Sequence, residues 1–255
     1  MFKSTKALVL RQVKYKEADL ILTVLTATDG KLTVKARGAL RKGSRVGAAA
    51  QALCYSDMTL FFNRGKWTLN EAQTIEQFLP LRADLEKLAL ASYFAEALEA
   101  VADEDDPQPE LLQLGLNCLY ALSATDTDPL LVKAAFELRL MCLSGYEPQL
   151  DVCPVCGKAP EDALFSVGGG CLHCRSCPPG TPGISLPLGR EALEAMRYVA
   201  SAPPRRILAF TLPPAGAKQL GEVCEAYLLA QLERGFGALD YWKRLHYQRT
   251  THTES

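Results

Sequence analysis

Four cysteines in two closely spaced pairs are the residues whose types and spacing predict the most definite chemistry. Cys153 and Cys156 form one Cys-x-x-Cys pair, and Cys174 and Cys177 form a second pair after seventeen intervening residues. Each two-residue gap lets a tight turn direct two thiolates at one ion, so the pattern predicts tetrahedral Zn²⁺. Four thiolates leave no open coordination position, which is typical of a structural zinc site.

Cys171 and His173 leave a second ligand set open. Cys171 and Cys174 also form a Cys-x-x-Cys pair, but fourteen residues then separate the two pairs. That separation is just below the usual range of about 15 to 20 residues, so the spacing favours Cys153, Cys156, Cys174 and Cys177. A vestigial or redox-active cysteine cluster and a catalytic zinc are the alternative interpretations.

A run of cations in the first third of the chain is the second candidate site. It contains six basic residues and no acid, and its members are Lys31, Lys35, Arg37, Arg41, Lys42 and Arg45. The glycines within and after this run predict a mobile loop that approaches a ligand closely. Such cations suit the phosphates of a nucleic acid, although a merely solvated charged face is the alternative.

Aromatic side chains near this run could stack against unpaired bases. The candidates are Tyr55, Phe61, Phe62 and Trp67. Strand alternation places Phe61 and Phe62 on opposite faces, so at most one of the two is expected in the core. For each aromatic residue, core packing is the alternative.

The distribution of charge supports a nucleic-acid partner for the amino-terminal part. The chain has 255 residues and a net charge of −1, but residues 1–80 carry a net +7 and the remainder carries −8. Nine cysteines in an odd-numbered set favour a reducing compartment, and no leader or long apolar run indicates a membrane. With three histidines and no nucleophile arrangement, we expect no catalytic residues and no enzymatic activity.

The hydrophobic periodicity changes near Pro80. Before it, alternating and β-branched runs separated by turns such as Asp29-Gly30 predict about five short strands, which suit a small barrel. After it, apolar residues at helical spacing predict helices on both sides of the cysteine segment, and the polar residues after Tyr247 predict a frayed end.

These features together resemble the RecO family of bacterial recombination mediators. The amino-terminal likeness lies in Ala7-Leu-Val-Leu10, Glu17-Ala18-Asp19, Thr26 through Lys31, and Lys35-Ala-Arg-Gly38 with the basic residues that follow. The second likeness lies in Cys153-x-x-Cys156-Gly157, Phe165-Ser166, Gly169-Gly170 and Cys174-x-x-Cys177. Alignment on Phe165-Ser166 again selects Cys174 and Cys177 over Cys171.

The resemblance implies an α+β multidomain chain. Residues 1–80 would form an OB-fold β-barrel that binds nucleic acid, residues 81–150 and 184–247 an α-helical carboxy-terminal domain, and residues 151–183 an inserted zinc module.

The resemblance also implies function and partners. It implies a cytoplasmic, nucleoid-associated DNA repair protein that binds single- and double-stranded DNA and anneals complementary strands. With RecR it would promote RecA loading onto DNA coated by single-strand binding protein. The acidic carboxy-terminal tail of that protein would bind in the helical domain, where Arg139, Arg197 and Lys218 are candidate cations. The alternatives are a zinc-ribbon protein that binds RNA or acts as a scaffold and, more distantly, a thiol-based redox enzyme.

Overall fold

The computed structural model describes residues 1–160, 162–178 and 183–253, which belong to two compact units. The first unit comprises Met1–Ala124 and Phe236–Ser255, and the second comprises Thr125–Gly235. The boundaries predicted for the barrel, the helical domain and the zinc module stay a prediction. Positions 161 and 179–182 of the expected zinc module lie outside the described residues.

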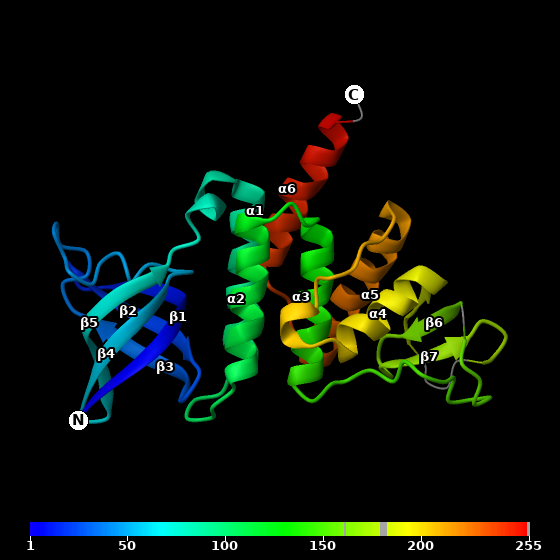
Figure 1. Cartoon of the computed structure of the whole chain (residues 1–255), viewed down its shortest axis with the longest axis horizontal. Coiled ribbons are helices and arrows are strands. Elements are labelled where there is room, and N and C mark those ends of the chain that lie inside the picture. Colours follow the sequence, from blue (N-terminus) through cyan, green and yellow to red (C-terminus); the bar gives the residue numbers. More distant parts are fainter. Residues whose placement is uncertain (161, 179–182, 254–255) are drawn as a thin grey trace. The chain divides into compact units, whose positions relative to one another are not determined.

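Five strands form a closed barrel at the start of the first unit (Figure 1). They are β1 (Phe2–Tyr15), β2 (Asp19–Thr26), β3 (Gly30–Ala36), β4 (Tyr55–Asn63) and β5 (Lys66–Glu76). Their order around the barrel is β1-β2-β3-β5-β4, and all neighbouring pairs are antiparallel except β3 and β5. This arrangement confirms the predicted OB-type barrel.

The long strand β1 closes the barrel because it pairs on both sides. Its first half pairs with β4, its second half pairs with β2, and its register with β2 shifts between Val9 and Arg11. An irregularity of this kind bends a strand and increases its twist, which a small barrel requires. Inward-facing aliphatic residues from all five strands fill the interior, among them Val9, Leu22 and Met58.

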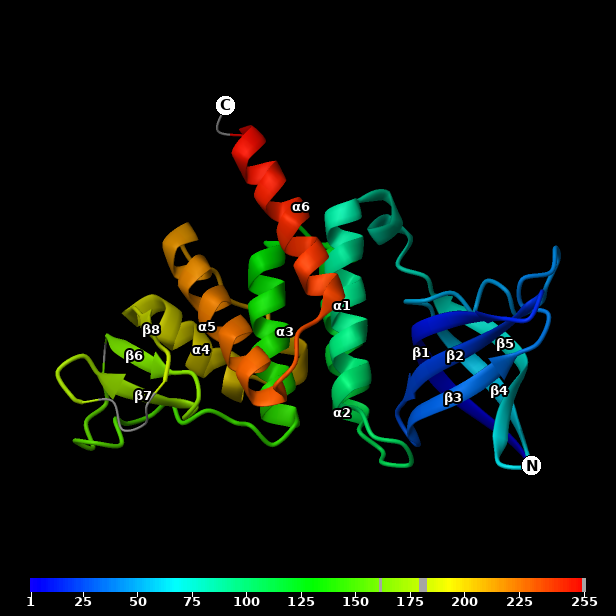
Figure 2. The same cartoon turned by 180° about the vertical axis from the view of Figure 1, so that it is seen from behind.

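Three helices complete the first unit, and they are α1 (Leu85–Val101), α2 (Pro109–Ala124) and α6 (Gly237–Thr253). A short 3-10 helix, Leu79–Ala83, leads from the barrel into α1, whose first turn is capped by the side chain of Asp84. Helices α1 and α6 pack side by side (Figure 2). Helix α6 continues to Thr253, so the residues after Tyr247 are helical, and the frayed end expected there stays a prediction.

The turn between β2 and β3 lies against the segment that joins α1 to α2. Gly30 has a φ of +62°, and an added Cβ would approach the backbone oxygens of Asp103 and Asp106 to 2.4 Å. Only glycine satisfies both the conformation and this close approach. The predicted Asp29-Gly30 turn therefore also attaches the barrel to the helices of its own unit.

The second unit combines three helices with a small sheet. The helices are α3 (Pro129–Leu143), α4 (Arg190–Ser201) and α5 (Pro214–Leu232), and a 3-10 turn, Pro204–Arg206, follows α4. The sheet has the order β7-β6-β8, with β6 (Ala163–Ser166), β7 (Cys171–Cys174) and β8 (Ser185–Leu188). The side chain of Asp128 caps α3, and Pro129 occupies its first turn.

Among the described residues, no helix combines the length and apolar character needed to span a membrane.

Candidate nucleic-acid interface and candidate metal centre

The segment that follows β3, residues 37–47, is here termed the basic loop. Ala39 and Val46 within it are buried and pack into the barrel core. The backbone N–H of Leu40 donates to the carbonyl of Ala18 at 3.0 Å, and the N–H of Gly38 donates to Oδ1 of Asp19 at 2.8 Å. The expectation of a mobile loop is therefore wrong, because buried side chains and hydrogen bonds to the β1–β2 turn hold it at several points.

Four of the six predicted cations are exposed on this loop, namely Arg37, Arg41, Lys42 and Arg45. Within the described part of the chain, none of these four side chains forms an ion pair. The anchored backbone presents four uncompensated charges to solvent at defined positions. Such an array attracts a polyanion without first having to break internal ion pairs.

Lys31 has a structural partner instead. Its Nζ donates to the backbone carbonyl of Glu99 at 2.9 Å, in the last turn of α1. The last carbonyls of a helix have no N–H donor within the helix, so a lysine from outside the helix can donate a hydrogen bond to one of them. Arg11 reaches the same residue, with its Nη2 2.8 Å from Oε1 of Glu99. Both cations therefore attach the barrel to α1.

Lys35 is shared between an acid and an aromatic ring. Its Nζ lies 3.1 Å from Oδ2 of Asp19 and 4.8 Å from the ring centroid of Tyr15. The hydrogen bond from the Gly38 N–H, with that from Lys35, lowers the pKa of Asp19 below its ordinary value. Asp19 is thus ionised at neutral pH, and it positions both Lys35 and the start of the basic loop.

The sequence pattern does not predict Asp19 or Tyr15 as residues of the nucleic-acid site. The register places them opposite each other on β1 and β2, and Leu20 of β2 pairs with Ala36 at the end of β3. Only this strand pairing brings the β1–β2 turn beside the basic loop. The one sequence signal for Asp19 is its place in Glu17-Ala18-Asp19, a segment that carries the family resemblance.

The predicted aromatic residues lie at two ends of the barrel. Phe62 and Trp67 are neighbours, with ring centroids 4.8 Å apart, and Trp67 pairs with Val34 close to the end of β3. Phe62 is partly exposed, whereas Trp67 packs partly against the core. Tyr55 is at the opposite end of β4 and is half-buried.

The four predicted zinc ligands converge in the second unit. The Sγ atoms of Cys153, Cys156, Cys174 and Cys177 all lie within 4.8 Å of one another. Those of Cys156 and Cys174 are 3.6 Å apart. A tetrahedral ion with sulfur ligands at about 2.3 Å requires sulfur–sulfur distances of about 3.8 Å, so the cluster fits such an ion.

Two backbone turns build this cluster. The N–H of Gly157 donates to the carbonyl of Cys153 at 2.8 Å, and the N–H of Cys177 donates to the carbonyl of Cys174 at 3.0 Å. Hydrogen bonding from the backbone of Cys174 lowers the pKa of the Cys153 thiol to about 6, against the effect of burial. Backbone donors directed at a thiolate favour the ionised form, which is the form that binds metals.

Cys171 and His173 lie outside the four-cysteine cluster. Instead they approach each other, with Sγ of Cys171 3.6 Å from Nε2 of His173. Burial, with the nearby Cys153 charge, raises the pKa of the Cys171 thiol. The structure thus brings together the four cysteines that the spacing favours, and it leaves Cys171 and His173 outside their cluster.

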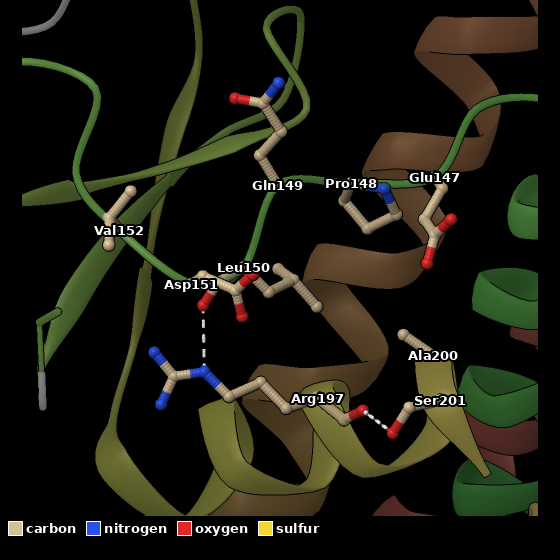
Figure 3. Close-up of a pocket in the computed structure, with 9 residues that line it drawn as sticks. All are labelled: Glu147, Pro148, Gln149, Leu150, Asp151, Val152, Arg197, Ala200 and Ser201. Atoms are coloured by element: carbon tan, nitrogen blue, oxygen red, sulfur yellow. Dashed lines mark hydrogen bonds between the residues drawn. The ribbon is translucent and has the colours of Figure 1, made fainter.

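A cavity of about 580 Å³ lies in the second unit between the segment after α3 and helix α4 (Figure 3). Arg197 borders it and donates from Nε to the carbonyl of Leu150 at 2.8 Å. Of the other candidate cations, Arg139 donates to the carbonyl of Ala200 beside the cavity. Lys218 is not among the lining residues and lies 3.9 Å from Glu222 on α5.

Comparisons with known proteins cover nearly the whole chain. Residues 1–78 match the family described as "Recombination protein O N terminal", and residues 82–240 match "Recombination protein O C terminal". The chain is 33% identical over 245 residues to "DNA repair protein RecO" of Acetivibrio thermocellus, covering 96% of this chain and 97% of the relative. It is 34% identical to the protein of that name from Desulforudis audaxviator, covering 94% and 96%.

Proposed function

Because this chain belongs to the RecO family of DNA repair proteins, we propose that it binds single- and double-stranded DNA through the basic loop of its barrel. The observation that carries this proposal is the set of four exposed cations, Arg37, Arg41, Lys42 and Arg45, which have no ion-pair partner in the described chain. Anchored cations neutralise phosphates of either form of DNA, because phosphate contacts do not depend on base identity.

Annealing follows from this binding without a covalent step. Two complementary strands repel each other, and a protein that neutralises phosphates while leaving base edges accessible lowers that repulsion. The chain then acts as a recombination mediator and not as an enzyme. With RecR it would promote the loading of RecA onto DNA coated by single-strand binding protein.

An annealing assay with naked complementary strands tests this proposal. The variant with alanine at Arg37, Arg41, Lys42 and Arg45 should anneal strands far more slowly than the wild type. A matched variant with alanine at four exposed cations of the second unit, Arg190, Arg205, Arg206 and Lys218, should anneal them normally. Normal annealing by the loop variant would refute the proposal.

We assign a structural Zn²⁺ to the four-cysteine cluster. Sulfur-only ligation favours zinc among the common divalent ions, and four ligands leave no position for a reacting water. The ion would stabilise a module whose sheet has three strands of four residues each. Cys153, Cys156, Cys174 and Cys177 would hold it.

The cavity at Arg197 is the proposed site for the acidic tail of single-strand binding protein. The Nη groups of Arg197 can bind a carboxylate, while Leu150 and Val152 offer apolar contact. A titration with a tail peptide tests this: Arg197→Ala should weaken binding several-fold, and Lys218→Ala should not. Equal affinity of wild type and Arg197→Ala would exclude this cavity.

We place the protein in the cytoplasm, associated with the nucleoid.

A further inference from the structure

An outward-facing row of side chains crosses three strands of the barrel beside the basic loop. Val13 of β1 pairs with Ile21 of β2, and Ile21 pairs with Lys35 of β3. Tyr15 occupies the next outward position on β1. Val13 is 45% exposed and Tyr15 is 43% exposed, so this end of the sheet presents apolar and aromatic surface to solvent.

The row is open at one end and covered at the other. Toward the helices, Arg11 on the same face of β1 binds Glu99 of α1. Toward the basic loop, the described residues provide no helix over Val13 and Tyr15, and both side chains stay exposed. The exposed patch is therefore confined to the end of the barrel where the uncompensated cations lie.

Two lysine ammonium groups lie over the ring of Tyr15. The Nζ atoms of Lys35 and Lys16 lie 4.8 Å and 5.7 Å from its centroid. Lys16 is exposed, and the backbone there has a φ of +57°, which turns the chain between β1 and β2. An aromatic face flanked by cations matches one nucleotide unit, in which a flat base is joined to a negative phosphate.

We propose that Tyr15 is a base-stacking residue, and that the surface of Val13, Tyr15 and Ile21 receives an unpaired nucleotide whose phosphates contact Lys16 and Lys35. This inference rests on the proposed DNA binding of the basic loop and adds a distinction that the loop cannot make. Phosphates are common to single and double strands, whereas a base is free to stack on a side chain only when it is unpaired. Tyr15 thus confers preference for single strands.

Binding of Tyr15→Ala to three labelled probes of equal length tests the proposal. The probes are a thymidine oligomer, a duplex and an abasic oligomer. Affinity for the thymidine oligomer should fall about 5- to 150-fold, the range expected for loss of one stacked base. Affinity for the duplex and for the abasic oligomer should stay within about twofold of wild type, because neither offers an unpaired base.

Two further variants control for folding and for surface tyrosines in general. Tyr15→Phe keeps the ring and should bind all three probes as the wild type does. Tyr120→Ala removes a more exposed tyrosine from α2, 59% exposed, and should leave binding to all three probes unchanged. A Tyr15→Ala protein that binds the thymidine oligomer normally, or that loses affinity for all three probes alike, would overturn the proposal.

The loop variant lacking Arg37, Arg41, Lys42 and Arg45 separates this proposal from the proposed function. It should weaken binding to all three probes, since all three carry phosphates. If the loop variant binds normally while Tyr15→Ala selectively loses the thymidine oligomer, the loop assignment fails and the stacking surface stands. If the loop variant loses affinity while Tyr15→Ala binds the thymidine oligomer normally, the stacking role of Tyr15 fails and the loop assignment stands.

Discussion

The carboxylate of Asp19 accepts a hydrogen bond from the backbone N–H of Gly38 at 2.8 Å, and this contact fixes the start of the basic loop to the β1–β2 turn. Gly38 has a φ of +62°, a conformation that favours glycine. One acid thus positions a segment whose function depends on cations. Removal of Asp19 should therefore loosen the loop even though it removes a negative charge from the DNA site.

Limited trypsin digestion tests this role of Asp19, because the loop offers four cleavage sites after its cations. Asp19→Ala should increase the rate of cleavage in residues 37–45, since unanchored segments open more often. Asp19→Asn keeps an oxygen that can accept from Gly38 and should be cleaved more slowly than Asp19→Ala. Equal rates for the wild type and both variants would show that the loop is held by its buried residues alone.

The Asp19 contact also has a defined pH dependence. Its pKa is lowered below the ordinary 3.8 by the hydrogen bond from Gly38 and by Lys35. A group with a lowered pKa stabilises the fold above its unfolded pKa, and that contribution is lost as the pH falls through the folded value. The amide shift of Gly38 should therefore stay constant at neutral pH and move only below pH 3.8 in an NMR titration. Movement near pH 6 would contradict this.

Lys31 should contribute to stability and not to DNA binding. Its Nζ caps a carbonyl at the end of α1, so Lys31→Ala should lower the free energy of unfolding by about 1 kcal/mol. The salt dependence of DNA affinity should not change. Arg41→Ala is the matched comparison, because it should flatten the log–log salt slope by about 0.7 without a change in stability. A flatter salt slope of DNA affinity for Lys31→Ala would show that Lys31 contacts DNA after all.

The metal centre predicts distinct behaviour for neighbouring cysteines. Cys153→Ser and Cys174→Ser should lose bound zinc and melt at lower temperature, whereas Cys171→Ser should retain one zinc per chain. Zinc affinity should fall as the pH decreases, since protons compete for the thiolates. Elemental analysis of the purified variants measures this directly. Full zinc occupancy in Cys174→Ser would show that the ligand set is wrong.

A buried ion network between α3 and α5 should be essential for the second unit. Nζ of Lys133 lies 2.8 Å from Glu137 and 2.7 Å from Glu225, and Lys133 is 2% exposed. Lys133→Met removes the buried charge that both carboxylates contact and should cost about 3 to 5 kcal/mol of unfolding free energy. The exposed Lys218, replaced in the same way, should change stability by about 0.5 kcal/mol at most.

The pH dependence of that network follows from Lys133. Burial would lower its pKa, but Glu137 and Glu225 together raise it above the ordinary 10.5. A raised pKa means that the stabilisation is fully present below pH 10.5 and is lost as the pH rises through the folded value. Denaturant titrations should therefore show the penalty of Lys133→Met undiminished from pH 7 to 9. A penalty that disappears in this range would contradict the assignment.

The sequence predicts the secondary structure and the metal cluster well because both depend on local patterns. Alternation and the Asp29-Gly30 turn predict the strands, and the cysteine spacing predicts which thiols meet. The nucleic-acid interface is harder to predict from the sequence, because it depends on the register in which the strands pair. Composition cannot reveal that Lys31 binds Glu99, nor that Asp19 anchors Gly38, since each contact joins residues that only the folded barrel brings together.

The central claim is that the anchored cations of the basic loop bind DNA phosphates, and the salt dependence of single-strand affinity tests it most directly. With alanine at Arg37, Arg41, Lys42 and Arg45, the log–log slope should become shallower by about 2 to 3 units, because each lost phosphate contact removes about 0.7. The equally charged second-unit variant with alanine at Arg190, Arg205, Arg206 and Lys218 should keep the wild-type slope. An unchanged slope in the loop variant, or equal flattening in both, would contradict the claim.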